Sequence, residues 1–194
     1  MIICVEGITN SGKSSLCKLI ESKRKLTVVN SLQRSSVVSQ QIKKITKPIN
    51  NIGKFDINTE LLLYSTLLSD KARIIESING DVIIDRFALS VFSYFIGRYS
   101  MDYSVVRSMV NYSSRNIIPD VTFFLDVSLE VIKDRAKESP FTRKDIGLEN
   151  YYNKLRNTYL SSLNDFSQKS FIIDCNSISE LEVYRYVCRC MEWT

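Results

Sequence analysis

The sequence predicts an α/β domain in which a parallel sheet of about five strands carries helices on both faces. Short apolar runs alternate along the chain with longer stretches that have helical spacing. The short runs are apolar almost throughout, which is typical of parallel strands buried on both faces. The length of 194 residues fits one domain, so we expect a single unit over residues 1–194.

Five runs have strand length and are rich in β-branched and aromatic residues: 2–5, 26–29, 82–84, 121–125 and 171–173. The stretches with helical spacing are 13–24, 58–79, 88–112, 128–136, 147–166 and 178–190. Turn and cap residues support these bounds, because Asn79-Gly80 ends a helix, Pro119 precedes a strand and Ser128 suits a helix N-cap.

Two charged stretches, 31–57 and 137–147, have the least pattern. Segments of this kind beside the carboxyl edge of a parallel sheet often contact ligands or form lids. We therefore expect ligand contacts from these two stretches, with a short lid at about 137–147.

The composition excludes several classes of enzyme, because the chain contains no histidine. Histidine-ligated zinc, Ser-His and Cys-His catalytic pairs and imidazole proton shuttles are all ruled out. Any catalysis must therefore use carboxylates, lysine, arginine, hydroxyls or backbone amides.

The five cysteines are odd in number and show no C-x-x-C spacing. We see no signal-peptide pattern and no apolar run near the ~20 residues of a membrane span. The sequence thus predicts a reduced, cytoplasmic protein with no membrane association, in which most cysteines are small buried side chains.

The net charge of +5 is uneven along the chain. Residues 1–54 hold ten Lys or Arg and two acidic residues, whereas residues 55–194 hold sixteen and nineteen. This excess fits either an anionic partner near the N-terminal third or a solvated basic surface.

A P-loop follows the first expected strand. Gly7-Ile-Thr-Asn-Ser-Gly-Lys-Ser14 matches G-x-x-x-x-G-K-[ST] and opens the first helix. Its glycines let backbone N–H groups surround a phosphate chain, Lys13 would reach the β and γ phosphates, and Ser14 would ligate Mg²⁺. The predicted ATP-binding residues of this loop are Gly7, Asn10, Ser11, Gly12, Lys13, Ser14 and Ser15.

The P-loop alone leaves the reaction open, but other features narrow it. Asn153-Lys154 lacks the aspartate of the guanine-reading N-K-x-D motif, which argues against a GTPase. Asp85 and Asp126 end apolar runs without the adjacent glutamate that motor ATPases use. The small size and basic lid-like segment favour a phosphoryl transferase that excludes water.

Further segments follow the P-loop in a characteristic order, and the most specific is Asp85-Arg86-Phe-Ala-Leu-Ser90-Val-Phe-Ser-Tyr94. From Ile2 to about Val187 the chain resembles the thymidylate kinase family of P-loop nucleoside monophosphate kinases. The segments that carry the resemblance are 6–7, 31–36, 59–64, 82–94, 119–127, 151–160 and 173–178.

The resemblance implies a P-loop kinase fold, ATP and Mg²⁺ as cofactors, and a set of site residues. Arg34 would hold the acceptor monophosphate, Tyr64 would stack on its base and Tyr94 would crowd the ribose 2′ carbon. The implied substrate-binding residues are Thr9, Arg34, Tyr64, Arg86, Ser90 and Tyr94. The implied catalytic residues are Glu6, Lys13, Asp85, Arg86 and Arg143, with Ser14 and Asp85 at the metal and Asn176 beside adenine.

One cation of the site is expected from the lid. Some members of the family carry an arginine inside the P-loop, but Asn10 and Ser11 are neutral here. Arg143 is the first candidate to approach the transferring phosphate when the lid closes, and the others are Arg135, Lys137 and Lys144.

The chain departs from the family pattern on the acceptor side. Thr9 stands where the family usually has an acidic residue near the acceptor sugar. Leu68 stands where the family has an arginine directed at the substrate phosphate, four residues after Tyr64. Lys71 or Arg73, about one turn further on, are candidates to replace that arginine.

The leading interpretation is ATP-dependent phosphorylation of a deoxynucleoside monophosphate, dTMP to dTDP. The first alternative is a deoxynucleoside kinase that acts on a 5′ hydroxyl with Glu6 as general base. The second is a nucleotide-binding module without catalysis, which the presence of Lys13, Ser14, Asp85 and Arg86 opposes. We expect a small nucleotide as substrate and no nucleic-acid polymer as partner. The resemblance alone implies a homodimer.

Overall fold

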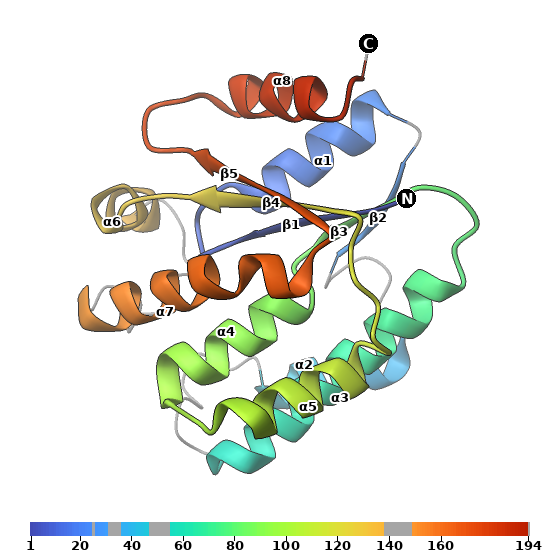
Figure 1. Ribbon diagram of the computed structural model, residues 1–194, viewed down its shortest axis with the longest axis vertical. Coiled ribbons are helices and arrows are strands. Elements are labelled where there is room, and N and C mark those ends of the chain that lie inside the picture. Colours follow the sequence, from blue (N-terminus) through green and yellow to red (C-terminus); the bar gives the residue numbers. More distant parts are fainter. Residues whose placement is uncertain (25, 31–35, 47–54, 138–148, 194) are drawn as a thin grey trace.

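The fold is built on a five-stranded sheet whose strands all run parallel in the order β2-β3-β1-β4-β5 (Figure 1). The computed structural model describes the chain except residues 25, 31–35, 47–54, 138–148 and 194. The strands are β1 (Ile2–Gly7), β2 (Thr27–Val29), β3 (Val82–Asp85), β4 (Val121–Asp126) and β5 (Lys169–Asp174). The predicted parallel α/β fold is therefore confirmed.

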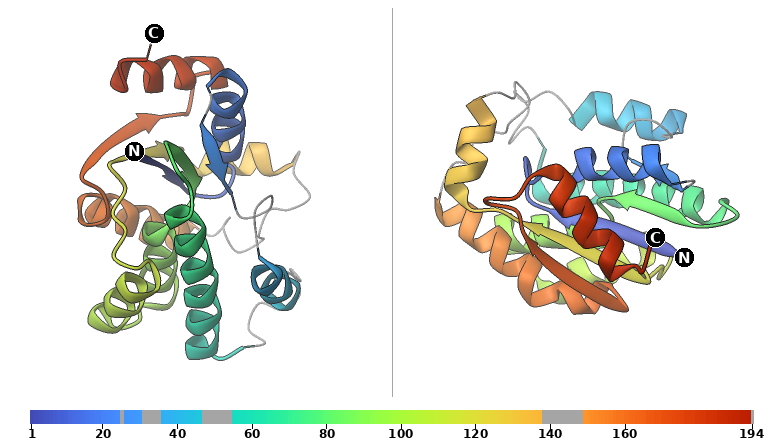
Figure 2. Two further views of the ribbon diagram at one scale, coloured as in Figure 1. Left: turned by 90° about the vertical axis from the view of Figure 1, so that its right-hand side faces the viewer. Right: turned by 90° about the horizontal axis from the view of Figure 1, so that it is seen from above.

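Helices cover both faces of the sheet (Figures 1 and 2). One face carries α1 (Lys13–Lys23) and α8 (Glu180–Cys190), which contact each other. On the opposite side lie α2 (Val37–Thr46), α3 (Ile57–Glu76), α4 (Ala88–Tyr99), α5 (Tyr103–Ser113), α7 (Glu149–Ser162) and the 3₁₀ turn η3 (Leu163–Phe166). The short α6 (Leu129–Lys137) follows the carboxyl end of β4.

Burial explains why the central strands show no polar alternation. The β1 side chains Ile3, Cys4 and Val5 are buried, as are all four residues of β3. The edge strand β5 differs, since Ile172 is exposed between Phe171 and Ile173. Helices on both faces thus account for the continuous apolar runs of the inner strands.

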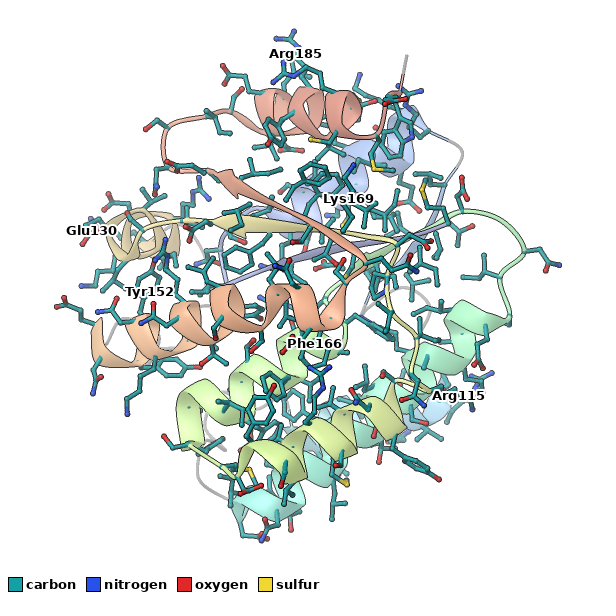
Figure 3. All side chains as sticks on the ribbon, in the orientation of Figure 1. Arg115, Glu130, Tyr152, Phe166, Lys169 and Arg185 are labelled. Atoms are coloured by element: carbon teal, nitrogen blue, oxygen red, sulfur yellow. The ribbon has the colours of Figure 1, made fainter. Side chains whose placement is uncertain are left out.

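Figure 3 shows the side chains on the ribbon and labels six of them. Tyr152 and Phe166 are buried, whereas Arg115, Glu130 and Arg185 lie at the periphery. All five cysteines are free, and Cys4, Cys17 and Cys175 are buried, which fits the expectation that most are small core side chains. In the described parts of the chain, no helix is long and apolar enough to cross a bilayer.

Two expected helix boundaries are wrong. The stretch 88–112 forms two helices, α4 and α5, because Ser100 adopts a left-handed conformation with φ 53° and Asp102 caps the second helix. The Asp102 carboxylate accepts a hydrogen bond from the Val105 amide at 3.0 Å. Similarly, the stretch 147–166 divides into α7 and the 3₁₀ turn η3.

The stretch 31–57, one of the two with the least pattern in the sequence, contains α2. Ser36 precedes this helix, and its hydroxyl accepts a hydrogen bond from the Ser39 amide at 3.2 Å. Asp56 caps the next helix, α3, by accepting from the amides of Asn58 and Thr59. The expected lid at 137–147 lies outside the described residues except for Lys137, which ends α6.

Candidate active site

The P-loop connects the carboxyl end of β1 to the first turn of α1, at the centre of the sheet. A Cβ on Gly7 would lie 2.6 Å from the Leu125 carbonyl oxygen, so only glycine fits this close approach. Gly12 occupies the α1 N-cap with φ 99°, and its conformation also favours glycine. The helix N-terminus therefore presents amide N–H groups and a positive dipole end toward the loop, as phosphate binding requires.

Lys13 folds back across the loop that precedes it. Its Nζ donates to the Ile8 carbonyl at 2.5 Å and to Ser11 Oγ at 3.0 Å, and the residue is 4% exposed. Burial lowers the pKa of Lys13, and the nearby guanidinium of Arg86 lowers the pKa further. A phosphate anion bound in the loop would favour the charged form of this lysine.

Ser14 and Asp85 meet beside the P-loop although 71 positions separate them. The Ser14 hydroxyl donates to Asp85 Oδ2 at 2.6 Å. Their oxygens suit Mg²⁺, which binds proteins through one or two carboxylates and takes its other ligands from phosphates and water. Among the described residues no group of three or more His, Cys, Asp or Glu could hold a metal, so the residues present fit a nucleotide-bound Mg²⁺ better than a protein-only metal site.

Glu6 is 1% exposed and anchors the start of α4. Its Oε1 accepts the amides of Phe87 at 2.8 Å and Ser90 at 3.3 Å, and Ser90 Oγ donates to Oε2. Glu6 thus serves α4 directly, where a carboxylate is favourable at the helix N-terminus.

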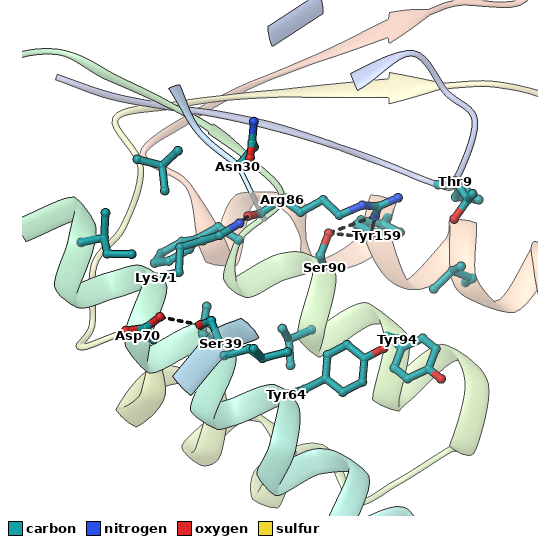
Figure 4. Close-up of a pocket in the computed structure, with 18 of the residues that line it drawn as sticks. Thr9, Asn30, Ser39, Tyr64, Asp70, Lys71, Arg86, Ser90, Tyr94 and Tyr159 are labelled. Atoms are coloured by element: carbon teal, nitrogen blue, oxygen red, sulfur yellow. Dashed lines mark hydrogen bonds between the residues drawn. The ribbon is translucent and has the colours of Figure 1, made fainter. Parts of the chain in front are cut away.

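Arg86 follows β3 in a left-handed conformation with φ 64°. Its Nη1 donates to the Gly7 carbonyl at 2.9 Å, to Ser90 Oγ at 3.3 Å and to the Tyr159 hydroxyl at 3.4 Å. These contacts place the guanidinium directly beside the P-loop (Figure 4). Tyr159, which comes from α7, was not among the predicted site residues. Burial raises the pKa of Tyr159, so its hydroxyl stays neutral.

A cavity of about 310 Å³ opens next to Arg86 (Figure 4). Its polar lining residues include Thr9, Asp70, Lys71, Arg86, Ser90 and Tyr159. Its aromatic and apolar lining residues include Tyr64, Leu68, Tyr94, Tyr151 and Leu155. A cavity lined by rings and by two cations suits a small ligand that carries a ring and an anion.

The two aromatic residues predicted to face the acceptor are both in this cavity. The rings of Tyr64 and Tyr94 lie 5.5 Å apart between centroids, at 31°. Glu60 fixes the far end of Tyr94 by accepting from its hydroxyl at 2.8 Å, and Glu60 also accepts from Tyr99 at 2.6 Å. Tyr94 therefore presents its ring, with its hydroxyl already engaged.

Comparisons with known proteins agree with this geometry. The model of the thymidylate kinase family matches residues 5–183. The chain belongs to the thymidylate kinase family. It is therefore classed with the nucleoside monophosphate kinases, which use ATP as phosphate donor.

Relatives and solved structures cover most of this kinase. It is 29% identical over 186 residues to the thymidylate kinase of Thermosipho africanus, covering 90% of this chain and 89% of the relative. It is 30% identical over 176 residues to that of Chlorobium phaeobacteroides, covering 82% and 80%. The thymidylate kinase structures from Candida albicans and Ehrlichia chaffeensis both superpose with a TM-score of 0.74, at 18% and 19% identity. They cover 98% of this chain, and 90% and 98% of their own chains respectively.

A second hollow of about 340 Å³ lies on the α8 side of the kinase P-loop. Arg135 from α6 lines it and donates to the carbonyls of Asn10 at 3.0 Å and Cys175 at 2.9 Å. Its other lining residues are Ser11, Gly12, Ser15, Leu16, Leu125, Ile178, Glu180 and Val183. The P-loop therefore has a hollow on each side, as a kinase with two nucleotide substrates requires.

Three further residues were predicted for the site, and the structure describes only one of them, Asn176. Asn176, expected near adenine, accepts from the Ser128 amide at 2.7 Å and donates to Asp174 at 2.6 Å, so its side chain serves the start of α6. Arg34 and Arg143 lie outside the described residues. The structure thus brings together the P-loop, Asp85, Arg86 and the acceptor-side aromatic residues, and adds Tyr159.

Proposed function

We propose that this kinase transfers the γ-phosphoryl group of ATP to dTMP and forms dTDP. The observation that carries the proposal is the position of Arg86, whose guanidinium lies between the P-loop carbonyl of Gly7 and the 310 Å³ cavity. A planar guanidinium in this place can contact phosphate oxygens of both substrates. Membership of the family and the curated relatives support dTMP as the acceptor.

The chemistry requires in-line positioning of two phosphates and cationic stabilisation of the oxygens between them. We assign Lys13 to the β and γ phosphates and Arg86 to the transferring group. Mg²⁺, held at Ser14 and Asp85, would supply further positive charge on the donor phosphates. Thr9, Ser90, Tyr64 and Tyr94 line the acceptor cavity and bind sugar and base, and the hollow beside Arg135 takes the adenine nucleotide.

A deoxynucleoside kinase would need a general base for the 5′ hydroxyl, and Glu6 is the candidate for that base. That carboxylate already accepts hydrogen bonds from two amides and the Ser90 hydroxyl. A base that is engaged in this way does not suit proton removal from a 5′ hydroxyl. The contacts of Glu6 therefore favour an acceptor that is already phosphorylated, which needs no such base.

The test is a substrate panel. The purified chain is incubated with ATP, Mg²⁺ and dTMP, dUMP, dCMP, dGMP, thymidine or deoxycytidine, and ADP release is followed. We expect the fastest turnover with dTMP. Turnover only with the nucleosides would overturn the proposal, and turnover with no acceptor would indicate a binding module.

We also propose that two copies of the kinase associate, as the resemblance implies. Support comes from large exposed apolar side chains on α3 and α5, including Leu62, Val105 and Tyr112. Sedimentation velocity measures this directly. A single species at the mass of one chain would contradict the dimer.

A further inference from the structure

We propose that Lys71 binds the phosphate of the acceptor nucleotide. In the family pattern an arginine at the position of Leu68 has this role. This inference rests on the proposed function, because it concerns how the same cavity recognises a monophosphate. Leu68 is 3% exposed and contributes only apolar surface to the cavity. Among the described lining residues, Lys71 is the cation available besides Arg86, while Arg34, which the resemblance assigns to the same phosphate, lies outside them.

Two backbone carbonyls hold the Lys71 ammonium in place. Its Nζ donates to the carbonyl of Asp85 at 2.9 Å and to that of Arg86 at 2.7 Å. A lysine ammonium has three N–H donors, and these two bonds use two of them. Lys71 lines the cavity (Figure 4), so the third N–H is placed to meet a ligand there.

The charges around Lys71 also favour an anion. The Lys71 ammonium lies near the Arg86 guanidinium and the carboxylates of Glu6 and Asp85. Asp70 also lines the cavity, but its carboxylate already accepts hydrogen bonds from Ser36, Ser39 and Arg73. Burial lowers the pKa of Lys71; the carboxylates of Asp85 and Glu6 and the Cys4 thiol oppose this effect, and Arg86 adds to it. A phosphate dianion beside Lys71 and Arg86 would favour their charged forms and offset the cost of burying Lys71.

Arg73 does not compete for this role. Its side chain is 54% exposed, and its guanidinium donates to Asp70 Oδ1 at 3.0 Å, one helical turn along α3. Arg73 does not line the cavity, whereas Lys71 does. Of the two candidates that the sequence offered, the geometry therefore selects Lys71.

The test measures dissociation constants for dTMP and thymidine by calorimetry in the unaltered kinase and in the Lys71→Gln variant. We expect Lys71→Gln to weaken dTMP binding by about 10- to 100-fold and to leave thymidine binding unchanged, because one charge-assisted hydrogen bond to phosphate is lost. Arg73→Gln is the matched control on the same helix and should change neither constant.

Three results would overturn the inference. They are equal losses for dTMP and thymidine in Lys71→Gln, an unchanged dTMP constant in that variant, and a selective loss of dTMP binding in Arg73→Gln. If Lys71→Gln does not fold, ¹⁵N spectra of the lysine-labelled unaltered kinase decide: dTMP, and not thymidine, should shift the Lys71 Nζ signal, identified from Lys71→Arg. If the unaltered kinase neither binds nor phosphorylates dTMP, the proposed function fails instead.

Discussion

At the scale of single residues, three cationic groups of the site are each fixed by backbone carbonyls outside their own element. Lys13 bonds to the Ile8 carbonyl, Arg86 to the Gly7 carbonyl and Lys71 to the carbonyls of Asp85 and Arg86. Groups fixed in this way lose little further freedom when phosphates bind, which is the basis of electrostatic preorganisation.

The sequence predicted part of this arrangement. The P-loop pattern identified Lys13 and Ser14 because it is local, and the resemblance identified Asp85 and Arg86. Tyr159 lies in the segment 151–160 that carries the resemblance, but its contact with Arg86 was not predicted, because that contact spans 73 positions and depends on how α7 packs. Lys71 was only one of two candidates, because a sequence does not show which side chain on α3 faces the cavity.

Replacement of Arg86 tests its role at the transferring phosphate. We expect Arg86→Gln to lower kcat by about 100-fold or more, because a preorganised cation is lost from the transition state. Steady-state kinetics with dTMP and ATP measure the change, and circular dichroism checks the fold. Arg185→Gln, on the exposed surface of α8, is the control; a kcat in Arg86→Gln equal to that of this control would refute the assignment.

The lid cation remains a prediction from the sequence. Arg143→Ala should lower kcat by at least ~100-fold with little change in fold, because the closing lid would lose its contact with the transferring phosphate. Turnover assays at saturating dTMP and ATP measure this. Near-normal turnover would remove Arg143 from the site and leave Arg135, Lys137 and Lys144.

At the scale of elements, close packing of α4 on α7 shapes the wall of the acceptor cavity. Gly97 makes this possible, because a Cβ there would lie 2.9 Å from the Leu155 Cα atom. We expect Gly97→Ala to lower the free energy of unfolding by about 1–3 kcal/mol, as overpacking does. Urea unfolding measures it, with Asn157→Ala on the exposed side of α7 as the control; equal stability of the two variants would contradict this packing.

A second contact between elements joins α2 to α3 beside the cavity. Asp70 on α3 accepts hydrogen bonds from the hydroxyls of Ser36 and Ser39 and from Arg73. Burial acts to raise the pKa of Asp70, but these three donors outweigh it and lower the pKa below its ordinary value. Stabilisation from this carboxylate is therefore present above the unfolded pKa of ~3.9 and lost as the pH falls through the folded value.

Replacement of Asp70 tests this contact through the pH dependence of stability. Asp70→Asn should lower the free energy of unfolding at pH 7 by about 1–3 kcal/mol, because the hydroxyls of Ser36 and Ser39 and the Arg73 guanidinium lose a charged acceptor. The difference should shrink as the pH falls below about 4. Urea unfolding at pH 7, 5 and 3 measures it against Asp134→Asn, an exposed pair with Lys137; a difference that does not depend on pH would contradict the assignment.

Helices and strands could be predicted where the spacing of apolar residues is regular. All five strands were located, because their apolar runs are nearly continuous. The break after α4 was missed because apolar spacing continues through it, and only Ser100 and Asp102 mark it. α2 was missed because it has only 10 residues within a charged stretch, and tertiary hydrogen bonds from Ser36 and Ser39 to Asp70 help to hold its first turn.

At the scale of the whole molecule, the sheet brings the ends of β1 and β3 side by side, with Val5 paired to Asp85. The P-loop, the Ser14–Asp85 pair and Arg86 therefore meet at one edge, with a hollow on either side. The absence of histidine is compatible with this chemistry, because phosphoryl transfer by lysine, arginine and a hydroxyl needs no imidazole. Part of the basic excess in residues 1–54 belongs to this site through Lys13.

The central claim is that both hollows act together, so that a phosphoryl group passes from ATP to a monophosphate. The most direct measurement follows the label of [γ-³²P]ATP after incubation with Mg²⁺ and dTMP, with Lys13→Ala as the inactive control. We expect the label in dTDP, in equal amount to the ADP formed. Label released as inorganic phosphate, or transferred only when thymidine replaces dTMP, would contradict the account.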